Sequence, residues 1–170
     1  MRIAVCALVA CAIGAPVQAA VPPPPKTNAL QDIYQGGFKA CAPAMERMVK
    51  TIHKDDAAYA WLGMWSMDKP DDQMATAVTS ERLEGGHAVT TFSAAKTDKG
   101  KCDVSVTYVE TALGESCAHV RENAYKAWRY VGDFNNATVY QDPETPNSKL
   151  VLTTAGAGCL IVKSIVGYGL

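Results

Sequence analysis

Four cysteines spread along one chain constrain the fold more than any other feature of this sequence. They are Cys41, Cys102, Cys117 and Cys159, and they remain when the N-terminal leader is set aside. An even number of cysteines in an exported chain indicates two disulfides, with three possible pairings. The chain has no C-x-x-C motif, and the four cysteines are spaced too far apart for a zinc site. We therefore expect structural disulfides, and neither a cofactor nor a metal centre.

The chain begins with "MRIAVCALVACAIGAPVQA". One arginine, a short apolar stretch and then small residues form the order of a secretory signal peptide, so we predict that residues 1–19 are removed after Ala19. The apolar stretch is shorter than the roughly 20 residues of a transmembrane helix, so we expect no membrane span. The alternative is a lipoprotein acylated at Cys11. We expect an exported protein, in a bacterial periplasm rather than a eukaryotic secretory route.

The rest of the chain is predicted to form one domain over residues 38–170. Residues 20–37 hold the proline-rich stretch "VPPPPK" and a weak helix that ends at two glycines. The 16 Lys and Arg residues are balanced by 17 Asp and Glu residues. A slightly acidic chain argues against a nucleic-acid or anionic-membrane partner, because such partners require a basic surface.

Two segments that begin with cysteine share a frame, "CAPAMERMVKTI" from Cys41 and "CAHVRENAYKAW" from Cys117. Both are predicted to be amphipathic helices, because their apolar residues recur at helical spacing. The second is expected to run from Cys117 to about Val131, with Ser116 as its N-cap. The matched positions are mostly apolar, so we interpret the similarity as repeated scaffold. Chance similarity of two amphipathic helices is the alternative.

Strands are predicted after each helix from apolar and polar alternation and from turn residues. The predicted strands cover residues 74–83, 87–95, 102–108, 137–141, 149–154 and 159–166. The expected fold class is α+β, with two helices packed on an antiparallel sheet and a possible pseudo-repeat of a helix plus three strands.

This repeat also predicts how the cysteines pair. With three strands in each half, the helices begin at one end of the sheet and the third strands begin at the other. We therefore expect Cys41 to pair with Cys117, and Cys102 with Cys159. Residues 57–73 are then an insertion. In an alternative frame residues 59–65 form an additional first strand, and Cys117 is left alone at its end of the sheet.

Two sets of residues are candidates for chemistry, although we predict no catalytic or metal-binding residue. His119 and the carboxylate of Glu122 share the second helix and are the candidate acid/base pair of a small cell-envelope hydrolase. Met64, Met67 and Met74 with a histidine are a candidate copper site. The simpler interpretations are a solvent-exposed helix surface for the first set and core or interface packing for the second.

The segment with the strongest indication of function contains Tyr59, Trp61 and Trp65, which share strand parity. Large aromatic residues are enriched in protein-binding surfaces, and a buried strand is the alternative. Our leading hypothesis is an exported, disulfide-stabilised, non-enzymatic binding module for a protein partner, of an inhibitor, immunity or envelope accessory type.

Overall fold

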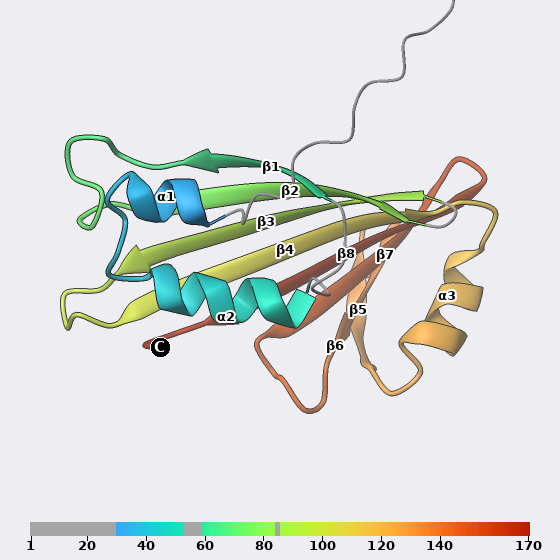
Figure 1. The fold of residues 1–170 in the computed structure, drawn as a ribbon. Coiled ribbons are helices and arrows are strands. Elements are labelled where there is room, and N and C mark those ends of the chain that lie inside the picture. The colour runs from blue at the N-terminus through green and yellow to red at the C-terminus, as the bar shows by residue number, and fades with distance from the viewer. Residues whose placement is uncertain (1–29, 53–58, 84–85) are drawn as a thin grey trace, which may run out of the picture.

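The structure, a computed structural model, describes residues 30–52, 59–83 and 86–170, and its centre is one eight-stranded antiparallel sheet (Figure 1). The strand order is β1-β2-β3-β4-β8-β7-β6-β5. The elements are α1 (Gln31–Gln35), α2 (Ala42–Ile52), β1 (Tyr59–Met64), β2 (Ala75–Leu83), β3 (Gly86–Lys96), β4 (Cys102–Ala112), α3 (Cys117–Ala124), β5 (Arg129–Phe134), β6 (Ala137–Gln141), β7 (Ser148–Ala155) and β8 (Gly158–Gly167).

The predicted α+β fold of two helices on a sheet is wrong, because the described chain is mostly β. The largest difference lies at α3, which ends at Ala124 instead of near Val131. Tyr125 caps this helix, and β5 begins only four residues later at Arg129. Aromatic and β-branched residues such as Tyr130 and Val131 favour strands, and pairing with β6 outweighs the helical spacing.

Each half of the chain has the same order of elements, a helix followed by four strands. The first half is α2 with β1 to β4, and the second is α3 with β5 to β8. The predicted three strands per half are therefore one too few. Residues 59–64, which the preferred frame treated as part of an insertion, form β1, as the alternative frame expected. The two halves join where β4 pairs with β8 at the middle of the sheet.

The two predicted disulfides are confirmed, but the predicted pairing is wrong. The bonds are Cys41–Cys102, with Cα atoms 5.6 Å apart, and Cys117–Cys159, with Cα atoms 4.9 Å apart. The miscounted strand explains the error. Each element reverses the chain direction, so a fourth strand begins at the same end of the sheet as the helix of its own half. Each disulfide therefore closes one half upon itself instead of linking the halves.

Both hydrophobic cores lie on the same face of the sheet, which we call the helix face. The first core packs α1 and α2 on β2, β3 and β4, and its largest buried side chains are Phe38, Phe92, Ile33 and Met45. The second core is smaller and lies under α3; its buried residues are Val120, Leu150, Leu152, Cys159 and Ile161. The first half thus contains most of the buried apolar surface that stabilises the fold.

We predict that a non-reduced peptide map of the oxidised protein contains the Cys41–Cys102 and Cys117–Cys159 linkages. Replacing either pair by alanine is expected to lower the free energy of unfolding by about 4 kcal/mol, because each bond closes a long loop of the unfolded chain. Urea denaturation of the two double variants measures this loss. A Cys41–Cys117 peptide in the map would contradict the fold.

A second prediction concerns the contact between Gly36 and Trp65. A Cβ atom at Gly36 would lie 2.3 Å from the indole ring, although the backbone φ of −70° suits any residue. We expect Gly36→Ala to destabilise the protein by about 1–3 kcal/mol through overpacking alone. Gly132→Ala is the matched control, because no atom lies within 4 Å of its added Cβ. Equal stability of the two variants would contradict the contact.

Candidate functional site

The face of the sheet opposite the helix face is the largest candidate surface, and we call it the open face. Side chains alternate between the two faces along each strand, and direct cross-strand partners share a face. One row of direct partners on the open face consists of valines from five adjacent strands, which we call the valine row. Its members are Val89, Val109, Val162, Val151 and Val139, from β3, β4, β8, β7 and β6.

Hydroxyl side chains flank the valine row. Thr91, Thr107 and Ser164 form the next row across β3, β4 and β8. The Oγ1 atom of Thr107 lies 3.4 Å from the Oγ atom of Ser164, and the Thr76 and Ser93 hydroxyl oxygens are 3.0 Å apart. These short, uncharged side chains bond to one another across the strands, so the surface is level here.

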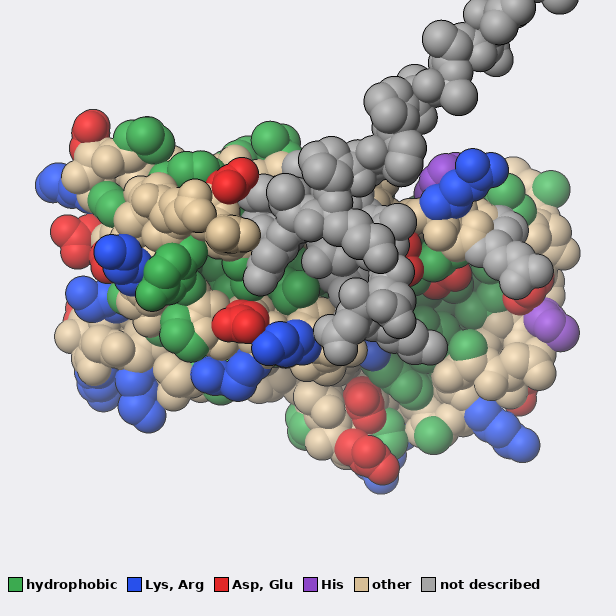
Figure 2. Space-filling model, viewed as in Figure 1, with side chains coloured by type: hydrophobic (Ala, Val, Ile, Leu, Met, Phe, Trp, Pro, Cys, Tyr) green, Lys and Arg blue, Asp and Glu red, His purple; other side chains and the backbone are tan. Residues whose placement is uncertain are grey.

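Charged side chains of the open face lie mostly towards its margins, with one exception. Arg82 and Asp103 are at the ends of β2 and β4, whereas Lys149 of β7 stands directly opposite Ser164. The Lys149 ammonium group donates hydrogen bonds to the side chain of Gln141 and to the carbonyl of Pro146. The helix side of the molecule differs, because Figure 2 shows acidic and basic side chains spread over it.

The centre of the open face coincides with the axis that relates the two halves. Thr107 follows Cys102 by as many residues as Ser164 follows Cys159, and these two residues are direct partners in the β4–β8 pair. An axis through this pair exchanges β4 with β8. The same surface therefore receives equivalent strands from both halves.

The predicted partner-binding residues lie at one edge of the sheet. Tyr59 and Trp61 belong to β1 and stand opposite Glu81 and Thr79 of β2; their side chains lie outside the described part of the structure. Trp65 follows β1, and its side chain packs against the first core. The structure thus brings Tyr59 and Trp61 onto one strand and places the Trp65 ring among core residues.

The three methionines of the candidate copper site are exposed, so their interpretation as core packing is wrong, while interface packing stays a prediction. Met64, Met67 and Met74 are 47%, 76% and 60% exposed, close to where β1 ends and β2 begins. His87 stands opposite Arg82 at the far end of β2, and His53 lies outside the described residues. Within the described ranges no three His, Cys, Asp or Glu side chains are grouped to hold a metal ion.

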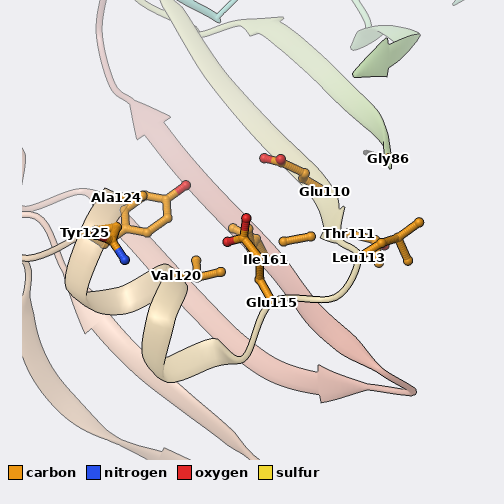
Figure 3. Close-up of a pocket in the computed structure, with 11 residues that line it drawn as sticks. Gly86, Glu110, Thr111, Leu113, Glu115, Val120, Ala124, Tyr125 and Ile161 are labelled. Atoms are coloured by element: carbon orange, nitrogen blue, oxygen red, sulfur yellow. The ribbon is translucent and has the colours of Figure 1, made fainter. Parts of the chain in front are cut away.

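A hollow of about 230 Å³ lies between the end of β4, α3 and the start of β8 (Figure 3). Its polar lining comes from Glu110, Glu115, Asn123 and Tyr125. Burial raises the pKa of the Tyr125 hydroxyl, and the negative charge of Glu110 adds to the shift. Of the described residues that line the hollow, none is a histidine, serine, cysteine or lysine.

The candidate acid/base pair does not line this hollow. His119 and Glu122 are exposed on α3. The backbone N–H of His119 donates to the Ser116 Oγ atom at 3.1 Å, which confirms Ser116 as the N-cap, and the His119 Nδ1 atom lies 3.2 Å from the side-chain nitrogen of Asn123. His119 therefore lies on the exposed surface of α3, where its side chain contacts Asn123 of the same helix.

Sequence reasoning missed the valine row. One signal was present in β8, where Leu160, Ile161 and Val162 are apolar on both strand parities. A strand that is apolar on both faces indicates a second contact surface in addition to the core. None of the helices in the described ranges has the length and apolar character required to cross a bilayer.

Comparison of the chain with protein-family models, curated proteins and solved structures finds no match.

The helix face also generates a pH prediction at Tyr108. Burial raises the pKa of the Tyr108 hydroxyl, and its 2.8 Å hydrogen bond to Glu110 adds to the shift. The native state therefore retains this proton where the unfolded chain releases it, so stability is complete below about pH 10 and falls as pH rises further. Tyr108→Phe is expected to flatten that fall in denaturation curves measured at several alkaline pH values. The exposed Tyr168→Phe is the control, and an equal fall in wild type and Tyr108→Phe would contradict the assignment.

Proposed function

We propose that the protein is an exported, disulfide-stabilised, non-enzymatic module that binds a folded protein partner through the open face of its sheet. The observation that carries this proposal is the open face itself, with a valine row that contains no charged residue and is flanked by hydroxyl side chains. The helix-face residues Tyr125 and Glu110 are not part of this surface.

The open face is large enough for a stable protein interface. Its eight strands, spaced about 4.8 Å apart, give a width of about 35 Å. The central strands β3 and β4 have 11 residues each, which corresponds to a length of about 35 Å. A face of about 1,000 Å² exceeds the roughly 800 Å² that each partner contributes to a standard protein–protein interface.

The chemistry of the face favours a protein over other partners. Nucleic acids and anionic membranes require clustered basic side chains, whereas the valine row has none and a single lysine, Lys149, stands beside Ser164 in the described sheet. Interfaces between proteins combine a central apolar area with hydrogen-bonding groups around it. The valine row and the hydroxyls of Thr91, Thr107 and Ser164 supply these two components.

The edge strand β1 extends this face. Leu62 and Met64 lie on the open face beside Val78 and Thr76 of β2. Tyr59, Trp61 and Trp65 are the partner-binding residues predicted from the sequence in this segment, but Tyr59 and Trp61 stand opposite Glu81 and Thr79, whose positions alternate with those of the open face, and Trp65 packs against the first core. The signal-like N-terminus and the two disulfides support export, and a bacterial periplasm is the compartment we propose. An inhibitor, immunity or envelope accessory role fits a module of this kind.

Affinity capture from a cell-envelope extract tests the proposal. The oxidised protein and a Val109→Lys/Val151→Lys variant serve as baits, because these valines lie on strands separated by β8 and their lysines would not stand directly opposite each other. We expect the variant to lose at least about 90% of the captured partner, since two buried ammonium groups oppose an apolar contact.

The matched control is Gln73→Lys/Ala118→Lys, which adds the same charge at exposed positions outside the open face. Circular dichroism and the disulfide map verify that both variants are folded. A partner set that is the same for wild type and for the open-face variant would refute binding through this face.

A further inference from the structure

The two edges of the sheet differ in their protection against pairing with another strand. At one edge, the register of β5 shifts between Tyr130 and Gly132, and the strand includes Arg129 and Asp133. Bulges and charged side chains are the features that prevent an edge strand from pairing with a foreign strand. The β5 edge is therefore blocked, although Val131 and Phe134 are exposed there.

The opposite edge has none of these features. The strand β1, with the sequence YAWLGM, pairs with β2 in unbroken register from Tyr59 to Met64 and contains no charged residue and no proline. In the part of the chain that the structure describes, no strand pairs with its outer side. Leu62 is 60% exposed and Met64 is 47% exposed. An apolar edge strand of this length would associate indiscriminately unless it had a defined partner.

We propose that β1 pairs antiparallel with β1 of a second copy of the chain, about a two-fold axis perpendicular to the sheet. A strand without charges pairs with itself without placing like charges opposite one another. The blocked β5 edge stops the assembly at two copies, because growth from a dimer requires a second open edge. One open and one blocked edge therefore fit a closed dimer better than a chain of subunits.

The alternation of side chains restricts the register of this pair. A two-fold axis perpendicular to a sheet keeps the open faces of both copies on the same side, so it must pass through a residue position of β1. Centring it on Leu62 places that residue opposite Leu62 of the second copy, and Gly63 opposite the second copy's Trp61. Leu62 and Val78 are neighbours in the β1–β2 pair, in line with Thr91 of β3, so this register places an apolar pair from each copy side by side on the open face.

The dimer extends the proposed function without depending on it. It places the open faces of two copies side by side on one continuous surface, which would present two equivalent binding faces to a partner. The dimer is inferred from the edge strand, whereas partner binding is inferred from the valine row, so either proposal can fail alone.

Sedimentation analysis of the purified, oxidised protein tests the proposal, and we expect twice the monomer mass. Leu62→Lys should raise the dimer dissociation constant at least about tenfold, because it sets two ammonium groups opposite each other and removes an apolar contact. Val131→Lys, the same change at the exposed position of the blocked edge, should leave the dimer intact. A monomeric wild type, or a dimer that Leu62→Lys leaves unchanged, overturns the proposal.

A cross-link gives an independent test that does not depend on weakening the dimer. Residues opposite each other in antiparallel strands have Cα atoms about 4.5–5.5 Å apart, which suits a disulfide. Leu62→Cys should therefore form a bond between two copies at this position, while Val131→Cys should not. Absence of the cross-link in a variant that retains both native disulfides overturns the proposal. Loss of a captured envelope protein on Leu62→Lys, with a monomeric wild type, would assign the edge to a strand of that protein.

Discussion

The pairing of β4 with β8 is the interaction on which the rest of the structure depends. It is the only strand pairing between the two halves in the described sheet, and it runs from Val104 opposite Gly167 to Ala112 opposite Cys159. Each disulfide ties the N-terminal end of a helix to the start of one of these two strands. The helices and the disulfides are thus attached to the β4–β8 pair, and the centre of the open face lies on it. This attachment keeps the proposed binding surface rigid.

The two halves share the same order of elements but differ in the size of their hydrophobic cores. The first core contains α1, for which the second half shows no counterpart among its described elements, while each core has one partly buried tryptophan packed against it, Trp65 in the first and Trp128 in the second. The second core relies on Val120 and on residues of β7 and β8, and the hollow beside Tyr125 and Glu110 lies next to it. The first half therefore acts as the more stable support for the shared sheet, because buried apolar area is the main stabilising contribution.

Local patterns predicted the strands that alternate, and they failed at the two edges. β4 was recognised from its regular alternation, whereas β1 is apolar on both parities and β5 follows helical spacing and contains a bulge. Missing one strand per half reversed the expected direction of the last strand and with it the disulfide pairing. The number of disulfides followed from the cysteine count, but the pairing required the topology. The open face was not predictable. Alternate residues of each strand lie on opposite faces, and which face stays uncovered depends on where the helices pack, which is not a local property of the sequence.

The two surfaces have side chains suited to different kinds of contact. The valine row and its hydroxyl neighbours are short and mostly β-branched, so they have few rotamers to lose when a partner binds. A face that is held by two disulfides and loses little entropy on binding favours one partner of matching shape. The β1 edge instead offers backbone hydrogen-bonding groups beside Leu62 and the exposed Met64, which adapt to an added strand. Rigid shape recognition on the face and backbone pairing at the edge can therefore operate in one molecule without competing for the same residues.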